Sequence, residues 1–114
     1  MRRLADGATY RESFDQLVYA TGAGPRRLEV PGADAQGIYG VATLADGLLL
    51  REVVERERPR RAVIVGGGYI GIEMAEAFVT RGIEVSLVEL GPQVMGTLDP
   101  DMGALVSAAL REAG

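Results

Sequence analysis

The sequence predicts an incomplete α/β fold in which a strand, a helix, a second strand and a second helix follow one another, after a short antiparallel β element. Two short apolar segments, Ala62–Val65 and Glu84–Leu90, are the predicted strands, and a helical pattern lies between them. The second helix begins at Asp99-Pro100. No third strand follows it, so the order β-α-β-α is one strand short of a βαβαβ half.

The N-terminal residues are expected to form the antiparallel element. Asp6-Gly7 is predicted to be the two-residue turn of a hairpin, because glycine accepts the positive φ that such turns require. The apolar segment Phe14–Ala20 is predicted to be a second short strand, which ends at the breaker cluster Thr21–Pro25. Residues 26–40 are expected to be loop.

A helix is predicted next, between Thr43 and Arg58. Thr43 and Asp46 resemble a capping box, in which a hydroxyl and an acid three residues later satisfy the first amides. The expected apolar face consists of Leu48, Leu49 and Val53. Arg58-Pro59 ends the helix, because the residue before a proline disfavours helical geometry. This point also predicts a boundary between two domains, residues 1–58 and 59–114.

The strongest pattern follows that boundary. Ala62–Val65 is a continuous apolar run, as expected for a parallel strand covered on both faces. Gly66, Gly68 and Gly71 then form G-x-G-x-x-G, where a strand passes into a helix. The predicted helix ends at Gly82, and its apolar stripes consist of Ile70, Met74 and Phe78, with Gly71, Ala75 and Val79 beside them.

In this context the glycine motif predicts an incomplete Rossmann-type βαβα unit that binds a dinucleotide. The first glycine allows a tight turn, the second lets the backbone approach a diphosphate, and the third lets the helix pack on the strand. Gly67 lies within this turn, and the amides around Tyr69 and Ile70 would hold the phosphates. The alternative is that the glycines serve tight packing alone.

Glu89 is the predicted partner of the adenosine ribose. It lies at the end of the second strand, 23 positions after Gly66, close to the spacing expected of this acid. A carboxylate there accepts hydrogen bonds from a ribose diol and repels a 2′-phosphate. Because residues 90–92 add no arginine, we expect NADH to be preferred over NADPH.

The last helix is expected to begin with Asp99 as its N-cap and Pro100 at its first position. Its spacing predicts a core-facing stripe formed by Met102, Leu105, Val106, Ala109 and Leu110.

Composition excludes several classes of function. The 114 residues carry a net charge of −4, which argues against a nucleic-acid binder. Cysteine and histidine are both absent, which removes thiol chemistry, Ser-His-Asp triads and the usual zinc sites, so no metal site and no catalytic residue is assigned. No apolar run reaches the length of a membrane helix, and we expect a cytoplasmic protein. The arginine pairs Arg26-Arg27 and Arg60-Arg61 are expected to be solvated surface.

Four segments together resemble the flavin-dependent pyridine nucleotide-disulfide oxidoreductase family, in particular its coenzyme A-disulfide reductase and NADH oxidase branch. They span nearly the whole chain in the family's order: residues 14–23, 30–32, 62–89, and 94–95 with 98–102. The resemblance implies that Ala20, Thr21 and Gly22 form the second FAD motif. It also implies that Tyr69 covers the flavin and that Glu73 pairs with a lysine, although this chain contains no lysine.

The family's first flavin motif, redox cysteine, later Gly-Asp flavin motif and dimerisation domain have no match here. The resemblance therefore implies an internal part of an FAD-dependent NAD(P)H oxidoreductase, from the end of the FAD domain to the start of the NAD domain. The whole enzyme would pass hydride from NADH to FAD and then to a disulfide or dioxygen, and the isolated chain is expected to be inactive. Either the chain is truncated, or a partner chain supplies the rest.

Two other functions stay open from the residues alone, namely a stand-alone nucleotide-binding module and a purely structural βαβ unit. The open edge of the predicted sheet is a template for strand pairing. We therefore also expect a homo-oligomer, which could be a dimer formed by strand exchange.

Overall fold

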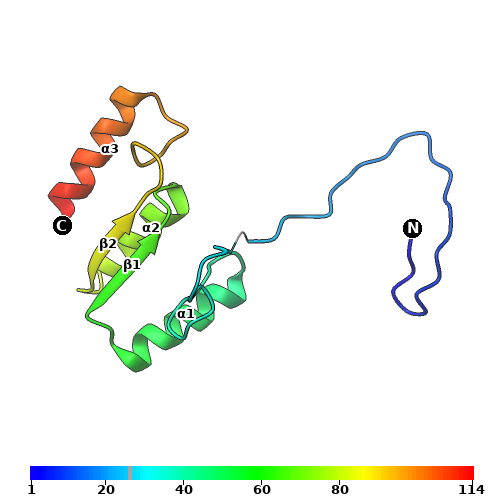
Figure 1. Cartoon of the computed structure of the whole chain (residues 1–114), viewed down its shortest axis with the longest axis horizontal. Coiled ribbons are helices and arrows are strands. Elements are labelled where there is room, and N and C mark those ends of the chain that lie inside the picture. The colour runs from blue at the N-terminus through cyan, green and yellow to red at the C-terminus, as the bar shows by residue number, and fades with distance from the viewer. Residues whose placement is uncertain (26) are drawn as a thin grey trace. The chain divides into compact units, whose positions relative to one another are not determined.

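The computed structural model describes residues 1–25 and 27–114, so Arg26 lies outside the described residues. The predicted order strand, helix, strand, helix is confirmed, with one helix before it (Figure 1). The elements are α1 (Leu44–Glu57), β1 (Arg61–Val65), α2 (Tyr69–Val79), β2 (Glu84–Val88) and α3 (Pro100–Ala113). The chain forms two compact units, residues 1–46 and 47–114. The domain boundary at residue 58 stays a prediction.

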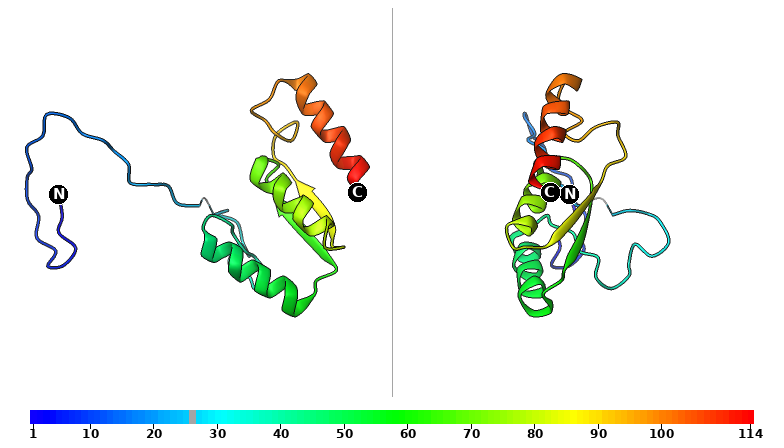
Figure 2. Two further views of the ribbon diagram at one scale, coloured as in Figure 1. Left: turned by 180° about the vertical axis from the view of Figure 1, so that it is seen from behind. Right: turned by 90° about the vertical axis from the view of Figure 1, so that its left-hand side faces the viewer.

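β1 and β2 form a two-stranded parallel sheet, with Arg61 opposite Glu84 and Val65 opposite Val88. α2 packs on one face of both strands (Figure 2). The expectation that β1 is covered on both faces is wrong, because Val63 is 67% exposed and Val65 is 62% exposed. Among the described residues no other helix packs on the strands, so one face of this sheet is open.

Among the described residues, the buried apolar side chains are those of Val53, Ala75 and Ile83. Leu50 and Val54 of α1, together with Met74 and Phe78 of α2, line one hollow of about 230 Å³. The predicted apolar helix faces are only partly right, because a side chain is buried only where its helix packs against another element. The predicted core residues that are exposed are Leu48, Leu49, Ile70, Val79, Met102, Leu105 and Ala109.

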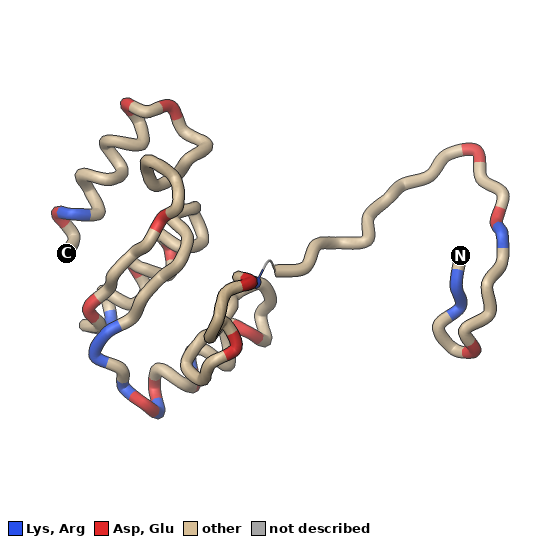
Figure 3. The backbone as a smooth tube through the Cα atoms, in the orientation of Figure 1, with Lys and Arg blue, Asp and Glu red and all other residues tan. Residues whose placement is uncertain are grey.

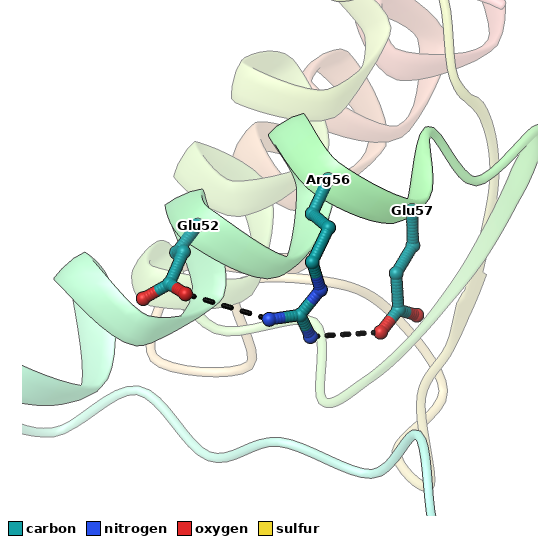
Figure 4. Close-up of polar contacts among 3 residues, drawn as sticks. All are labelled: Glu52, Arg56 and Glu57. Carbon is teal, nitrogen blue, oxygen red and sulfur yellow. Dashed lines mark hydrogen bonds and ion pairs between the residues drawn. The ribbon is translucent and has the colours of Figure 1, made fainter.

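The ends of α1 are set by the predicted signals. The Thr43 amide donates to Asp46 Oδ2 at 2.8 Å, and the Asp46 amide donates to Thr43 Oγ1 at 3.2 Å, which completes the capping box. At the other end, Arg58 has φ 45° and Pro59 follows, so α1 stops at Glu57. Figure 4 shows Arg56 near this end, where its guanidinium contacts the carboxylates of Glu52 and Glu57.

The end of α2 is a Schellman turn built on Gly82. Gly82 has φ 74°, its amide donates to Val79, and the Ile83 amide donates to Phe78 at 3.1 Å. This turn leads Ile83 into the core and starts β2. The strand ends at Val88, two residues earlier than predicted.

α3 begins at the predicted place, without a hydrogen bond from the side chain of its N-cap. Asp99 is its N-cap and Pro100 its first residue, yet the Asp99 carboxylate makes no capping hydrogen bond. The Asp99 carbonyl accepts the Gly103 amide at 2.9 Å, which is the first hydrogen bond of the helix. Among the described residues, no helix combines the length and apolar character that crossing a membrane requires.

The N-terminal residues form less sheet than predicted. A single antiparallel bridge joins Arg2 to Thr9, and its loop runs over residues 4–7 with only Gly7 at positive φ. The predicted two-residue type I′ turn is therefore wrong, because that turn needs two residues at positive φ. Phe14–Ala20 is not a strand either, because no described segment pairs with it. Its apolar side chains are exposed, Val18 at 86%.

Candidate nucleotide-binding site

The glycine turn lies where β1 passes into α2, beside the carboxyl end of β2. Gly66 has φ 112°, and its amide donates to the Val88 carbonyl at 2.8 Å, so the chain turns sharply while still held to the sheet. A Cβ on Gly71 would overlap the Gly66 carbonyl oxygen. The first and third glycines therefore permit the turn and the close packing of α2 against β1.

Gly67 is the buried residue of this turn. Its amide donates to Glu89 Oε2 at 2.5 Å, and its carbonyl accepts the Met95 amide at 2.7 Å. A Cβ there would lie 2.9 Å from Val94 Cγ1. Gly68, in contrast, has open space where its Cβ would be. The turn is therefore closed on the side of residues 89–95 and open at Gly68.

The N-terminus of α2 presents unpaired amides on that open side. The Ile72 amide donates to the Gly68 carbonyl at 3.1 Å. The amides of Tyr69 and Ile70 come earlier in the helix, where no preceding helical turn supplies a carbonyl to accept them. Gly68, the N-cap, has no side chain that could cap them. Unsatisfied amides and the positive end of the helix dipole favour an anion at this position.

Glu89 lies one residue past β2, rather than within it as predicted, and is half-buried. Oε1 accepts the Gly91 amide at 2.8 Å and Oε2 accepts the Gly67 amide. These two amides, Gly91 first, lower the pKa of the Glu89 carboxyl below its ordinary value of 4.5, so it is charged at neutral pH. A carboxylate has about four lone-pair sites, which leaves acceptors for the two hydroxyls of a ribose.

The structure thus brings together most of the predicted site residues. Within residues 47–114, the glycine turn, the start of α2 and Glu89 share one end of the sheet. Tyr69 is 68% exposed and Glu73 is also exposed, so neither side chain is fixed by packing. Ala20, Thr21 and Gly22 belong to the other compact unit, where each is exposed.

Charge around the site is sparse. Figure 3 shows basic residues gathered where α1 leads into β1, at the end of the sheet away from the glycine turn. In the sequence these are Arg58, Arg60 and Arg61. No group of acidic side chains that could hold a metal ion is found within the described part of the chain.

Met95 belongs to a segment that carries the family resemblance, but the sequence assigned it no role at this site. It contributes a backbone amide and adopts φ 51°, a conformation that methionine rarely takes. Neither property depends on the methionine side chain, so the residue type at position 95 does not indicate this role.

With this geometry in view, comparison with known proteins identifies the family. The pyridine nucleotide-disulphide oxidoreductase family matches residues 2–114. The chain belongs to this family. An NADH oxidase of Methanocaldococcus jannaschii is 38% identical over 96% of the chain, and a CoA-dependent NAD(P)H sulfur oxidoreductase of Pyrococcus abyssi is 36% identical over 96%. The chain spans about a quarter of the length of these relatives, 25% of each.

Solved structures of similar proteins share the fold. The water-forming NADH oxidase of Lactobacillus brevis, solved with NADH bound, is 31% identical with a TM-score of 0.77. It matches 99% of this chain, which covers 25% of that protein. A ferredoxin reductase of Rhodopseudomonas palustris is 33% identical with a TM-score of 0.77, and the match covers 83% of this chain and 23% of that one. The Rossmann-like α/β architecture expected from the sequence is therefore confirmed.

Proposed function

We propose that residues 59–114 of this chain bind NADH as the first part of an NAD-binding domain, and that residues 1–58 are the end of an FAD-binding domain. The observation that carries the proposal is the pairing of Glu89 with the Gly67 amide. This contact sets a charged acceptor beside a turn whose next amides have no acceptor. A diphosphate at the amides and a ribose at the carboxylate would satisfy both groups.

The same geometry favours NADH over NADPH. A 2′-phosphate would lie against the charged Glu89 carboxylate, and residues 90–92 are Leu, Gly and Pro, which provide no positive charge. The nearest concentration of arginine along the chain precedes β1, at the other end of the sheet. Charge repulsion without compensation lowers the affinity for NADPH.

Calorimetric titration of the chain with NADH and NADPH tests this function. We expect saturable NADH binding, and an NADPH affinity lower by about tenfold or more, which corresponds to about 1.4 kcal/mol. Glu89→Gln should reduce this preference, because the amide no longer repels the phosphate. Glu84→Gln, at the other end of β2, is the matched control and should change neither affinity. Equal affinities would refute the preference, and the absence of saturation would refute nucleotide binding.

In the whole enzyme, the proposed reaction passes hydride from NADH to FAD and then to a disulfide or dioxygen. Relatives named as NADH oxidases and as a CoA-dependent sulfur oxidoreductase support this class of reaction. The flavin would carry the redox chemistry, and Ala20, Thr21 and Gly22 would approach it. Because the chain contains no cysteine, it supplies no thiol of its own. We therefore propose that the chain alone does not turn over NADH.

The chain is also proposed to associate with a second copy of itself. The two-stranded sheet has unpaired edges, and Phe14–Ala20 is an apolar segment without a strand partner among the described residues. Exposed strand edges pair readily with apolar segments of another chain. Strand exchange between two copies would cover both features.

A further inference from the structure

The peptide that joins Gly67 to Gly68 has a fixed orientation. The Met95 amide holds the Gly67 carbonyl at 2.7 Å. The peptide between Gly67 and Gly68 is trans, so the Gly68 N–H points in the opposite direction to that carbonyl. By holding the carbonyl, Met95 therefore aims the Gly68 N–H away from residues 89–95, toward the open side of the turn.

The preceding peptide is fixed as well. Glu89 accepts the Gly67 N–H, so the Gly66 carbonyl on the same peptide points the other way. It points toward Gly71, where only the absence of a Cβ leaves room for it. Two successive peptides of the glycine turn are thus held, one by a side chain and one by a backbone amide.

Met95 is itself held in place by its neighbours. Its carbonyl accepts the Leu98 amide at 2.8 Å, which closes a turn, and Val94 lies against Gly67. Gln93 Nε2 donates to the Leu98 carbonyl at 3.0 Å, and the Gln93 side chain contacts Gly103 of α3. Met95 adopts the left-handed φ of 51° between these two bonds, the one its amide donates to Gly67 and the one its carbonyl accepts from Leu98. The connection from β2 to α3 therefore braces the glycine turn.

We infer that Met95 is a positioning residue for dinucleotide binding, because its backbone amide fixes the direction in which the Gly68 amide meets the diphosphate. This inference rests on the proposed function. It assigns the role to the backbone conformation of residue 95 and not to the thioether. Residues that accept a left-handed conformation should therefore replace methionine, and β-branched residues should not.

Three variants at position 95 and one control variant test this inference by NADH titration. Met95→Val should weaken NADH affinity about tenfold, because valine resists positive φ and releases the Gly67 carbonyl. Met95→Asn and Met95→Gly should stay within about twofold of the wild type, because both accept this conformation. Met102→Val makes the same change at an exposed position of α3 and should leave the affinity unaltered.

The amide proton shift of Gly68, measured by NMR without ligand, separates positioning from general stability. Met95→Val should move this resonance, whereas Asn and Gly at position 95 should retain it. A Val variant with a lower urea midpoint but unchanged affinity and Gly68 shift would overturn the inference. So would a Met95→Gly variant whose affinity falls tenfold, which also decides the case if the Val variant does not fold. Failure of the wild type to bind NADH would instead reject the proposed function, and the inference with it.

Discussion

Glu89 joins two backbone segments that are far apart in sequence. Its carboxylate accepts amides from Gly67, in the turn after β1, and from Gly91, after β2. Both bonds favour the charged form, which is why the pKa of Glu89 is lowered from 4.5. The same charge that holds the glycine turn would select between NADH and NADPH.

This lowered pKa predicts a pH dependence of stability. Because the folded-state pKa of Glu89 lies below its unfolded value, its contribution is fully present above about pH 4.5 and is lost as the pH falls through the folded pKa. Urea unfolding between about pH 3 and pH 6 should show that Glu89→Gln has a lower free energy of unfolding than the wild type at the upper end of this range. The difference should shrink as the pH falls. A difference that stays constant with pH would contradict this origin.

At the residue scale, the glycine turn and Glu89 could be predicted because their chemistry requires particular residue types at fixed spacing. Gly66 needs positive φ and Gly71 needs a missing Cβ, and only glycine meets both demands. Met95 could not be predicted, because its contribution is a backbone amide that every residue except proline carries.

Helix boundaries were predictable because capping is local. Thr43 with Asp46, Gly82, and Asp99 with Pro100 each mark an end through interactions within a few residues. The buried faces were less predictable, because burial depends on which elements meet. Leu48 and Leu49 fit a helical stripe, but the hollow between α1 and α2 is lined by Leu50 and Val54 instead.

Replacing each of two glycines by alanine tests whether a glycine is needed at the end of a helix and dispensable inside one. Gly82→Ala should destabilise residues 47–114 by about 1 kcal/mol, because alanine resists the left-handed φ of 74°. Gly47→Ala, inside α1 with open space around its Cβ position, should stabilise the chain by about 0.5–1 kcal/mol. Urea unfolding followed by circular dichroism measures both changes. Effects of the same sign would contradict the assigned roles.

At the scale of the whole molecule, strand pairing was the least predictable feature. Phe14–Ala20 has the composition of a strand, but a strand also requires a partner, and none of the described segments provides one. The outer face of β1 shows the same dependence, because Val63 and Val65 have no covering layer. Sequence alone indicated the preference for these structures and not the presence of the neighbours they need.

This unpaired segment predicts self-association. Sedimentation analysis of the chain should show a dimer or larger species, because the apolar segment and the sheet edges can pair between copies. Val18→Lys should shift the distribution toward monomer by placing a charge in the segment. Leu4→Lys, at a side chain 95% exposed outside the segment, should not. A wild-type chain that remains a monodisperse monomer would contradict the proposal.

The most direct measurement is the mapping of amide resonances of the ¹⁵N-labelled chain during titration with NADH. We expect the largest shifts on Gly68, Tyr69 and Ile70, where the amides have no acceptor, and on Gly67 and Gly91, which share Glu89. Arg60 and Arg61, at the other end of the sheet, should not move. Shifts centred elsewhere, or no shift at saturating NADH, would show that this turn does not hold a dinucleotide.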